Sequence, residues 1–397
     1  MANEALGAAK EKKNDEFYTQ YEDIQKEINA YLEYDPDTFR DKTVLLPCDD
    51  PEWSNFTRFF AQNFDRLGLK KLISTSYATE SKQKHSPVQI SIFEFLTEYE
   101  KQSPQYDEKI SPKRGKIFTL TRRNKKIDIN DLQWKYLDGD GDFRSEEVTC
   151  LRDEADIIVT NPPFSLFRQF VAWIFEAKKD FLIIGNQNAI TYKEFFPYLK
   201  DNKAWLGVSI TSGDRKFNVP DNYPLEAATC GVDENGKKFI RVKGVRWFTN
   251  LDHGRRHQPL PLMTMADNLK FSKHKEIKEQ GYLKYDNYDA IEVPYTDAIP
   301  SDYDGVMGVP ITFLDKYCPE QFEIIGITKT WFGLASKVYP NQTQVSRNGN
   351  TSIVSKLNDG PAIKVSQKPL DTTFYMVDND YYIQLYARVL IRKKATE

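Results

Sequence analysis

Short apolar runs recur along the first two thirds of the chain, and segments with an apolar residue every three or four positions lie between several of them. Runs of about four to eight apolar residues are typical of buried strands, and the second pattern is typical of amphipathic helices. Ile24, Ile28 and Leu32 predict one such helix. Strands are predicted at residues 43–47, 71–75, 117–120, 134–137, 157–160, 181–185, 205–208 and 239–249.

The order of these elements predicts an α/β protein with a doubly wound, largely parallel sheet. The last two strand candidates of the series have turn-like sequence between them, which favours an antiparallel end to that sheet. Beyond residue 250 the alternation fades, Pro, Asn, Gly and Tyr become frequent, and β-rich pieces appear at 323–327 and 381–391. We therefore predict two domains, residues 1–250 and a smaller C-terminal region of residues 251–397.

The segment Asn161-Pro162-Pro163-Phe164 directly follows the predicted strand at 157–160 and carries the clearest chemistry of the chain. An amine conjugated to a ring is a weak nucleophile because its lone pair is delocalised. If the Asn161 side-chain oxygen and the Pro162 carbonyl accept its two hydrogens, the lone pair is freed for attack. Pro162 and Pro163 stiffen the loop, since each fixes φ and lacks a donor. Phe164 can stack on the ring.

A plainer interpretation of the same four residues is a Pro-Pro strand exit that only ends a sheet element. The sequence after the loop favours the catalytic interpretation, because an amphipathic helix follows at once. A strand, loop and helix in this order put the loop at the carboxyl edge of a parallel sheet, where open α/β folds bind ligands. The apolar face of that helix consists of Leu166, Phe167, Phe170, Val171, Ile174 and Phe175.

Composition fits a cytoplasmic enzyme of 397 residues with a sizeable core. No apolar run approaches 18 residues and the N-terminal sequence has no signal-peptide pattern, so neither a membrane span nor secretion is expected. The four cysteines are widely separated without a CxxC pair, and His253 and His257 lack an HExxH context. We therefore expect neither a disulfide framework nor a metal site.

The net charge of −3 conceals basic clusters. From Ile324 to the end of the chain, seven Lys and three Arg face four Asp and one Glu. Each cluster alone could be a solvated face, but together with an amine-binding loop they favour phosphate contacts. The candidate DNA-binding residues, taken from the C-terminal region and from clusters near 122 and 255, are Arg122, Arg123, Arg255, Arg256, Lys337 and Arg347.

The order of motifs resembles that of the S-adenosylmethionine-dependent N6-adenine DNA methyltransferases, and more narrowly the EcoRI modification methylase family. The resemblance implies a Rossmann-like methyltransferase sheet with a C-terminal target-recognition region. It also implies S-adenosyl-L-methionine as cofactor, double-stranded DNA as substrate and a possible cognate restriction endonuclease. The matching segments are residues 15–24, 47–51, 139–144, 161–168, 181–194 and 307–315.

The resemblance assigns cofactor-binding roles to two further segments. Phe17, Tyr18 and Thr19 match the motif that covers the cofactor, although Thr19 could instead be a helix cap. Asp142 and Phe143 match the acid and the aromatic that hold its adenine. Their plainer interpretation is a turn, because the sequence around them is rich in Gly and Asp.

The loop after the first strand departs from the wider class, because residues 47–56 contain no glycine and the backbone can approach a ligand less closely. Pro47, Asp49 and Asp50 are its cofactor candidates, with Asn161 contributing from the other loop; Asp49 or Asp50 could meet the cofactor's ammonium group. No acid ends the strand at 71–75 to take the ribose hydroxyls.

The predicted reaction is direct methyl transfer to the N6 amine of a flipped adenine that is held by Asn161 and Pro162 and stacked on Phe164. Two alternatives stay open at this point. The same loop could serve adenine in RNA or a glutamine amide in a protein. The glycine-free loop could also belong to a DNA-binding protein that keeps the fold without catalysis.

Overall fold

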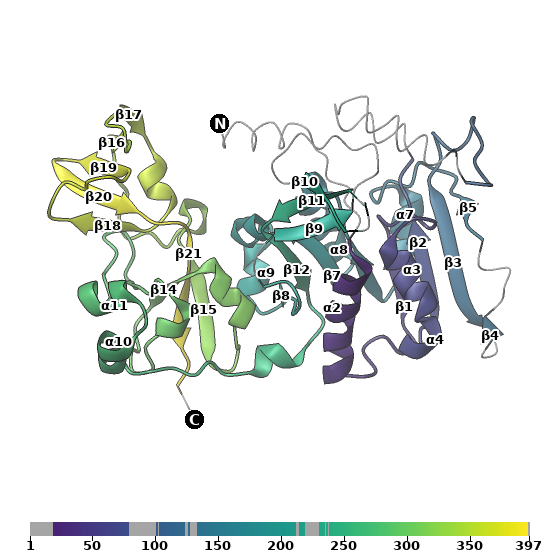
Figure 1. Cartoon of the computed structure of the whole chain (residues 1–397), viewed down its shortest axis with the longest axis horizontal. Coiled ribbons are helices and arrows are strands. Elements are labelled where there is room, and N and C mark those ends of the chain that lie inside the picture. The colour runs from purple at the N-terminus through teal and green to yellow at the C-terminus, as the bar shows by residue number, and fades with distance from the viewer. Residues whose placement is uncertain are drawn as a thin grey trace. The chain divides into compact units, whose positions relative to one another are not determined.

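The computed structural model describes residues 19–78, 101, 103–123, 126–127, 133–211, 214–218, 230–234, 236 and 238–395. The chain divides into two compact units, coloured along the sequence in Figure 1. Unit 1 comprises Met1–Asn188 and Leu206–Gly254, and unit 2 comprises Ala189–Trp205 and Arg255–Glu397. Contacts between distant parts of the chain thus group the internal segment Ala189–Trp205 with the C-terminal residues. The predicted division at residue 250 does not include this segment in the C-terminal region.

Unit 1 contains the main sheet and the helices beside it. Its helices are α2 (Tyr21–Tyr34), α3 (Asn55–Gln62), α4 (Phe64–Leu67), α7 (Glu146–Glu154) and α8 (Phe167–Glu176). Its strands are β1 (Thr43–Leu46), β2 (Lys71–Thr75), β3 (Lys116–Arg123), β4 (Lys126–Ile127), β5 (Lys135–Tyr136), β6 (Ile157–Thr160), β7 (Asp180–Asn186), β9 (Asp214–Asn218), β10 (Cys230–Val232), β11 (Lys238–Lys243) and β12 (Val245–Thr249), and β8 (Trp205–Leu206) lies at the boundary of the two units.

The main sheet has the order β4-β3-β2-β1-β6-β7-β12-β8, with β5 beside β3. Strands β2, β1, β6 and β7 are parallel, whereas β3 and β12 run antiparallel to their neighbours. The sequence prediction of a doubly wound sheet with an antiparallel end is therefore confirmed. From β1 the chain adds β2 on one side and later β6 on the other, so the order reverses between β1 and β6. Ligands of open α/β sheets bind at the carboxyl ends of strands where the order reverses in this way.

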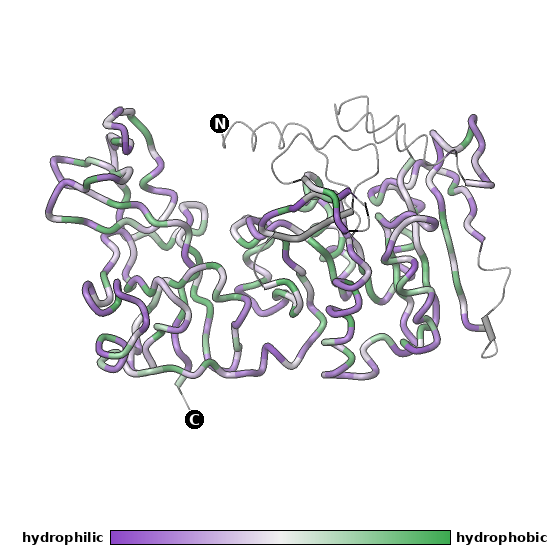
Figure 2. The backbone as a smooth tube through the Cα atoms, viewed as in Figure 1, coloured by the Kyte–Doolittle hydropathy of each residue, from purple (hydrophilic) through white to green (hydrophobic). Residues whose placement is uncertain are grey.

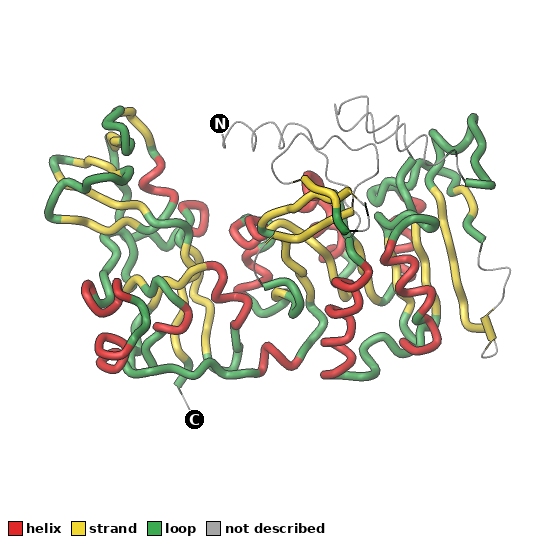
Figure 3. The backbone as a smooth tube through the Cα atoms, viewed as in Figure 1, coloured by secondary structure: helices red, strands yellow, loops and turns green. Residues whose placement is uncertain are grey.

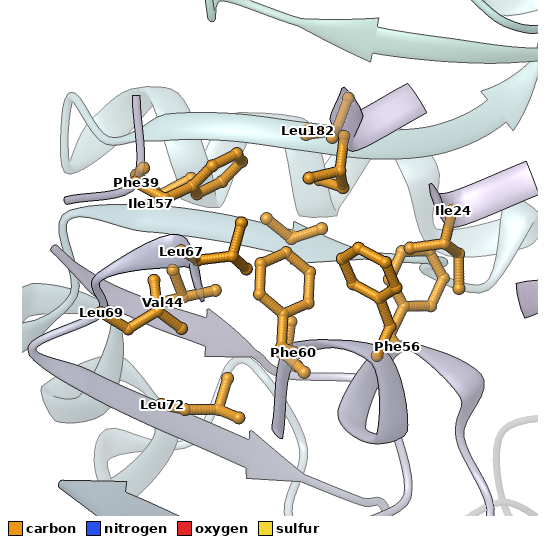
Figure 4. Close-up of a cluster of buried hydrophobic side chains, with 14 of the residues drawn as sticks. Ile24, Phe39, Val44, Phe56, Phe60, Leu67, Leu69, Leu72, Ile157 and Leu182 are labelled. Atoms are coloured by element: carbon orange, nitrogen blue, oxygen red, sulfur yellow. The ribbon is translucent and has the colours of Figure 1, made fainter. Parts of the chain in front are cut away.

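The core of unit 1 forms where buried strands meet the aromatic face of α3. Strands β1 and β6 are buried along their whole length, and α3 contributes Phe56, Phe59 and Phe60. Figure 4 shows Phe56 and Phe60 from α3 among Val44, Ile157 and other side chains of the sheet. Ser54 caps α3 by accepting a hydrogen bond from the Phe56 amide, so the helix starts directly after the loop that follows β1.

Two predicted strands are wrong in extent, because each contains a turn. The run at 239–249 is divided by Gly244, whose φ of +70° is readily adopted only by glycine. Strand β11 joins a separate three-stranded sheet with β9 and β10, while β12 stays in the main sheet. The run at 381–391 likewise divides into β20 (Asp380–Gln384) and β21 (Arg388–Lys393), which belong to different sheets of unit 2.

Unit 2 is built mainly from strands and short helical turns, as Figure 3 shows by colour. Its first sheet has the order β13-β14-β21-β15 and its second the order β17-β16-β19-β20-β18. The hydropathy colouring of Figure 2 shows apolar segments along strands of both units. The elements not yet given are α9 (Phe196–Lys200), α10 (Met265–Phe271), α11 (Lys275–Gln280), β13 (Ile291–Glu292), β14 (Met307–Pro310), β15 (Phe322–Ile327), β16 (Gln342–Val345), β17 (Thr351–Val354), β18 (Ala362–Val365) and β19 (Phe374–Val377).

Within the residues that the structure describes, no helix combines the length and apolar character needed to cross a membrane.

Candidate active site

Asp49 connects the loops that follow β1 and β6. Its carboxylate accepts hydrogen bonds from the Ser54 hydroxyl at 2.7 Å and from the Thr160 hydroxyl at 2.5 Å, and the Asn161 backbone N–H also interacts with it. Its backbone carbonyl accepts from the Ser74 hydroxyl at 2.5 Å. One residue therefore fixes the start of α3, the end of β2 and the residue next to Asn161, at the point where the strand order reverses.

The Asp49 carboxyl group is almost completely buried, with 5% of the residue exposed. Burial raises its pKa from 3.8 to about 7; the hydrogen bonds from Thr160 and Ser54 oppose this shift, and the nearby negative charge of Asp50 adds to it. Among the described residues, Asp49 forms no ion pair with a cationic side chain. A positively charged ligand at this edge of the sheet would favour the ionised carboxylate.

The Asn161-Pro162-Pro163-Phe164 loop leaves β6 at this place. Asn161 is half-buried and Pro162 is buried. The Pro163 carbonyl accepts a hydrogen bond from Leu166 N–H at 2.9 Å and so belongs to the turn that leads into α8. Phe164 is half-buried and packs in part against the core of unit 1, which holds its ring while part of it remains accessible. The helix predicted after the loop is confirmed as α8.

Asp142 and Phe143 lie in a loop that packs on the chain just after β2. The Ala78 N–H donates to the Asp140 carbonyl at 2.7 Å, and a side chain at Gly141, whose φ is +79°, would collide with the Ser76 carbonyl. The loop is thus held at the same edge of the sheet as Asp49 by a close backbone approach that requires glycine.

Both predicted adenine contacts have protein partners in this structure. The Asp142 carboxylate pairs with Arg144, with Oδ2 2.6 Å from Nη2. Phe143 is buried against α8, edge-on to Phe170 at 5.0 Å and to Trp173 at 5.6 Å between ring centroids. A cofactor ring would therefore meet the rim of Phe143 or require it to shift.

Thr19 lies beside the loop that carries Asp49. Its carbonyl accepts a hydrogen bond from the Asn55 side chain at 2.8 Å. Its hydroxyl is buried and has no hydrogen-bond partner among the described residues. Since a buried hydroxyl without a partner is costly, Thr19 is suited to a ligand contact. Phe17 and Tyr18, predicted for the same motif, lie outside the described residues.

Asp50 and Pro47 stabilise the loop. The Asp50 carboxylate accepts the backbone N–H of Glu52 at 2.8 Å and pairs with the Lys116 ammonium at 3.2 Å. The Pro47 carbonyl accepts from the Thr75 hydroxyl at 3.1 Å. These contacts show how a loop without glycine keeps a defined path. Lys116 belongs by sequence to the basic cluster near 122, but it is 4% exposed and is therefore not a surface charge.

The candidate DNA-binding residues of unit 1 are only partly described. The Arg122 guanidinium lies 3.4 Å from the Asp65 carboxylate and over the Phe64 ring at 5.9 Å. Arg123 belongs to β3 and pairs through its backbone with Lys126, but its side chain lies outside the described part of the chain. Both stay predictions.

In unit 2, one candidate needs correction. Arg256 is 6% exposed, stacks over the Trp205 ring at 3.5 Å and donates to the Asn202 side chain at 2.5 Å. A guanidinium stacked and bonded in this way serves packing, so we withdraw Arg256 as a phosphate contact. Its neighbour Arg255 is half-buried.

The other two candidates of unit 2 differ in their surroundings. Lys337 pairs with Asp286 at 2.6 Å and lies over the Tyr339 ring at 5.0 Å, so its charge is largely compensated. Arg347 is exposed in the turn between β16 and β17. Arg347 is therefore the better placed of the two to reach a partner.

Sequence reasoning missed the roles of Ser54 and Thr160, which hold Asp49. Their local signals were present: Ser54 precedes a helix that it caps, and Thr160 is the last residue of a buried strand. No local pattern predicts the contact between Thr160 and Asp49, because it joins two parts of the chain more than a hundred positions apart in sequence.

The residues at this edge fit S-adenosyl-L-methionine, which carries an ammonium and a sulfonium. Asp49 is a buried carboxyl group whose ionised form a cationic ligand would stabilise, and Thr19 offers a buried hydroxyl without a partner. The described residues contain no group of three His, Cys, Asp or Glu arranged to hold a metal ion.

This sheet and site define a methyltransferase of Rossmann-like fold, and comparison with known proteins narrows the class. Residues 5–394 match the family model described as adenine-specific methyltransferase EcoRI, and the chain belongs to that family. It is 45% identical to the type II methyltransferase M.EcoRI of Escherichia coli over 327 residues, which cover 82% of this chain and 90% of the relative. It is 36% identical to the type II methyltransferase M.MpnI of Mycoplasma pneumoniae over 319 residues, covering 80% and 83% respectively. No solved structure matches at a significant level.

Proposed function

We propose that this protein transfers a methyl group from S-adenosyl-L-methionine to the N6 amine of adenine at specific sites in double-stranded DNA. The observation that carries the proposal is the Asn161-Pro162-Pro163-Phe164 loop at the end of β6, fixed by Asp49 at the ligand-binding edge of the sheet. Membership of an adenine-specific family supports adenine as the target base.

In this mechanism the chain's own residues bind and orient the amine. The Asn161 side-chain oxygen and the Pro162 carbonyl accept its two hydrogens, which draws the nitrogen towards tetrahedral geometry. Phe164 stacks on the base, which must leave the duplex to reach the loop. When bound, the cofactor supplies an electrophilic methyl group and a positive charge that the transfer neutralises. No strong base is needed before attack, and the amine proton leaves afterwards.

Asp49 and Thr19 would hold the charged methionine part and Asp142 the adenine of the cofactor. We assign target recognition to unit 2, because its exposed Arg347 lies in a turn between two strands. A type II relative also makes a cognate restriction endonuclease a reasonable functional partner, with the activity expected in the cytoplasm where the resident DNA lies.

The decisive test is methyl incorporation by the purified full-length chain into duplex DNA, RNA and glutamine-containing peptides, followed by mass spectrometry of the modified residue. We expect N6-methyladenine in DNA. Modification of RNA or of glutamine would instead identify adenine in RNA or a glutamine amide as the substrate. DNA binding without transfer to any substrate would favour the non-catalytic alternative, and long-read sequencing of DNA from expressing cells would give the recognition site.

Asp142→Ala should weaken cofactor binding by about 1 to 3 kcal/mol, because a buried adenine amine would lose its acceptor. The measurement is calorimetric titration with S-adenosyl-L-methionine. Arg144→Ala is the matched control, since it removes the same ion pair but leaves the carboxylate. Equal cofactor affinity in wild type and in the Asp142 variant would show that Asp142 has only a structural role in its turn.

A further inference from the structure

The hairpin of β16 and β17 is an edge of unit 2 with unusual exposure. Among the strands that the structure describes, β17 pairs with β16 alone. Thr351, Ser352 and Ile353 are all exposed on it, although neighbouring residues of a strand point to opposite faces. Ile353 is 88% exposed. Both faces of β17 are therefore accessible, so the strand extends beyond the core of its sheet.

Edge strands of soluble proteins are normally protected by charged side chains or proline against pairing with other chains. Strand β17 has the sequence Thr-Ser-Ile-Val and carries neither. An uncharged edge strand with an almost fully exposed isoleucine tends to associate with other chains unless a binding partner covers it.

The register extends the accessible surface across the sheet. Ile353 lies opposite Thr343, Thr343 opposite Met376, and Met376 opposite Tyr381. These four side chains form one row on one face, and the last three are half-buried. The opposite face packs on the core of this sheet, where Tyr375 and Tyr382 are buried.

The side chains of the hairpin have the chemistry of base recognition. Residues 341–358 contain two basic residues, Arg347 and Lys356, and no acidic one. The turn exposes Arg347 and Asn348 at its tip, and its path is fixed by a hydrogen bond from the Asn350 N–H to the Ser346 hydroxyl and one from the Ser346 N–H to the Asn350 carbonyl. Arginine pairs with guanine, asparagine with adenine, and an apolar side chain with the thymine methyl group.

We propose that the β16–β17 hairpin enters the major groove of the target duplex and reads its sequence, with Arg347 and Asn348 at the tip and Ile353 against a thymine methyl group; this rests on DNA being the substrate. A two-stranded ribbon fits the width of the major groove. The absence of acidic side chains suits the phosphates on either side of it. Gln342 takes no part, because it is buried and its side chain bonds to Tyr339 and Leu357.

The first experiment measures methylation of a random-sequence duplex library by the full-length chain, wild type and variants. Arg347→Ala should relax discrimination at one guanine position by about tenfold or more. Ile353→Ala should relax it at a thymine position by about fourfold, the factor expected for one buried methyl group. The matched controls are Arg392→Ala and Phe271→Ala, which remove exposed side chains of similar kind from other elements and should leave the profile unchanged.

The second experiment removes the groups on the DNA. A cognate duplex with uracil in place of the contacted thymine should slow wild type but not Ile353→Ala, and 7-deazaguanine should likewise affect wild type but not Arg347→Ala. Unchanged profiles in both hairpin variants would overturn the proposal. So would a wild-type dimer that Ile353→Lys dissociates without changing specificity, because β17 would then pair with a second copy. Failure of wild type to methylate any DNA would instead refute the proposed function.

Discussion

Asn161→Ala should lower kcat at least a hundredfold while cofactor affinity changes little. The substitution removes one of two acceptors for the amine hydrogens, and loss of an oriented polar group of this kind costs about 2.7 to 4 kcal/mol in the transition state. The loop should keep its position, because Asp49 is held through Thr160 and through the backbone of Asn161, which the substitution retains. Single-turnover methylation with cofactor and DNA both saturating gives the rate directly.

Phe164 variants give the matched comparison for this loop. Phe164→Ala should weaken binding of the flipped base by roughly 1 to 3 kcal/mol, whereas Phe164→Trp should keep part of the activity, since stacking needs only an aromatic face. Calorimetry with the cofactor and a melting curve establish that each variant is folded. Near-normal turnover in Asn161→Ala would contradict the proposal that the Asn161 side chain binds the target amine.

As the pH is raised towards 7, the affinity for S-adenosyl-L-methionine should increase about tenfold per pH unit, and above pH 7 it should level off. The reason is that the cationic cofactor favours ionised Asp49, and the pKa of this buried carboxyl group is raised to about 7. Between pH 5 and pH 7 the change would be about fiftyfold, since half of the carboxyl groups are ionised at a pH equal to the pKa. Binding near pH 6 should release a proton, which calorimetry detects as a dependence of the heat on the buffer.

The stability of the unliganded protein should change in the opposite direction. The folded-state pKa of Asp49 lies above the unfolded value, so its contribution is complete below about pH 4 and is lost as pH rises through 7. Asp49→Asn should flatten both pH dependences, whereas Asp50→Asn should keep them and move them to a slightly lower pH, because the negative charge of Asp50 adds to the raised pKa of Asp49. A cofactor affinity that keeps its pH dependence in Asp49→Asn would place the responsible group elsewhere.

Local sequence was sufficient for the central part of the fold. The predicted strand at 71–75 matches β2, and that at 157–160 matches β6, because each is a short apolar run with clear flanking breaks. The runs at 239–249 and 381–391 failed as single strands, since a turn inside an apolar stretch does not interrupt its hydrophobic pattern. Pattern also gave no sign that residues 189–205 group with unit 2, which depends on contacts distant in sequence.

The candidate site shows the same division. Residue chemistry indicated the Asn161 loop, and comparison with the family pattern drew attention to the two acids after β1. The strand order then explained why these loops meet. Sequence could not distinguish Asp49 from Asp50, because only the folded chain buries the former and pairs the latter with Lys116. Nor could it distinguish Arg256, stacked on Trp205, from an exposed arginine.

The position of β21 has a consequence for how the chain is made. This strand, formed by residues near the end of the sequence, lies between β14 and β15 and pairs Ile391 with both Met307 and Ile324. A ribosome that has synthesised everything up to residue 387 therefore holds a chain whose first unit 2 sheet lacks a middle strand. The first sheet of unit 2 can close only after residues 388–393 have been synthesised, and a stop before them would leave β14 and β15 without the strand that joins them.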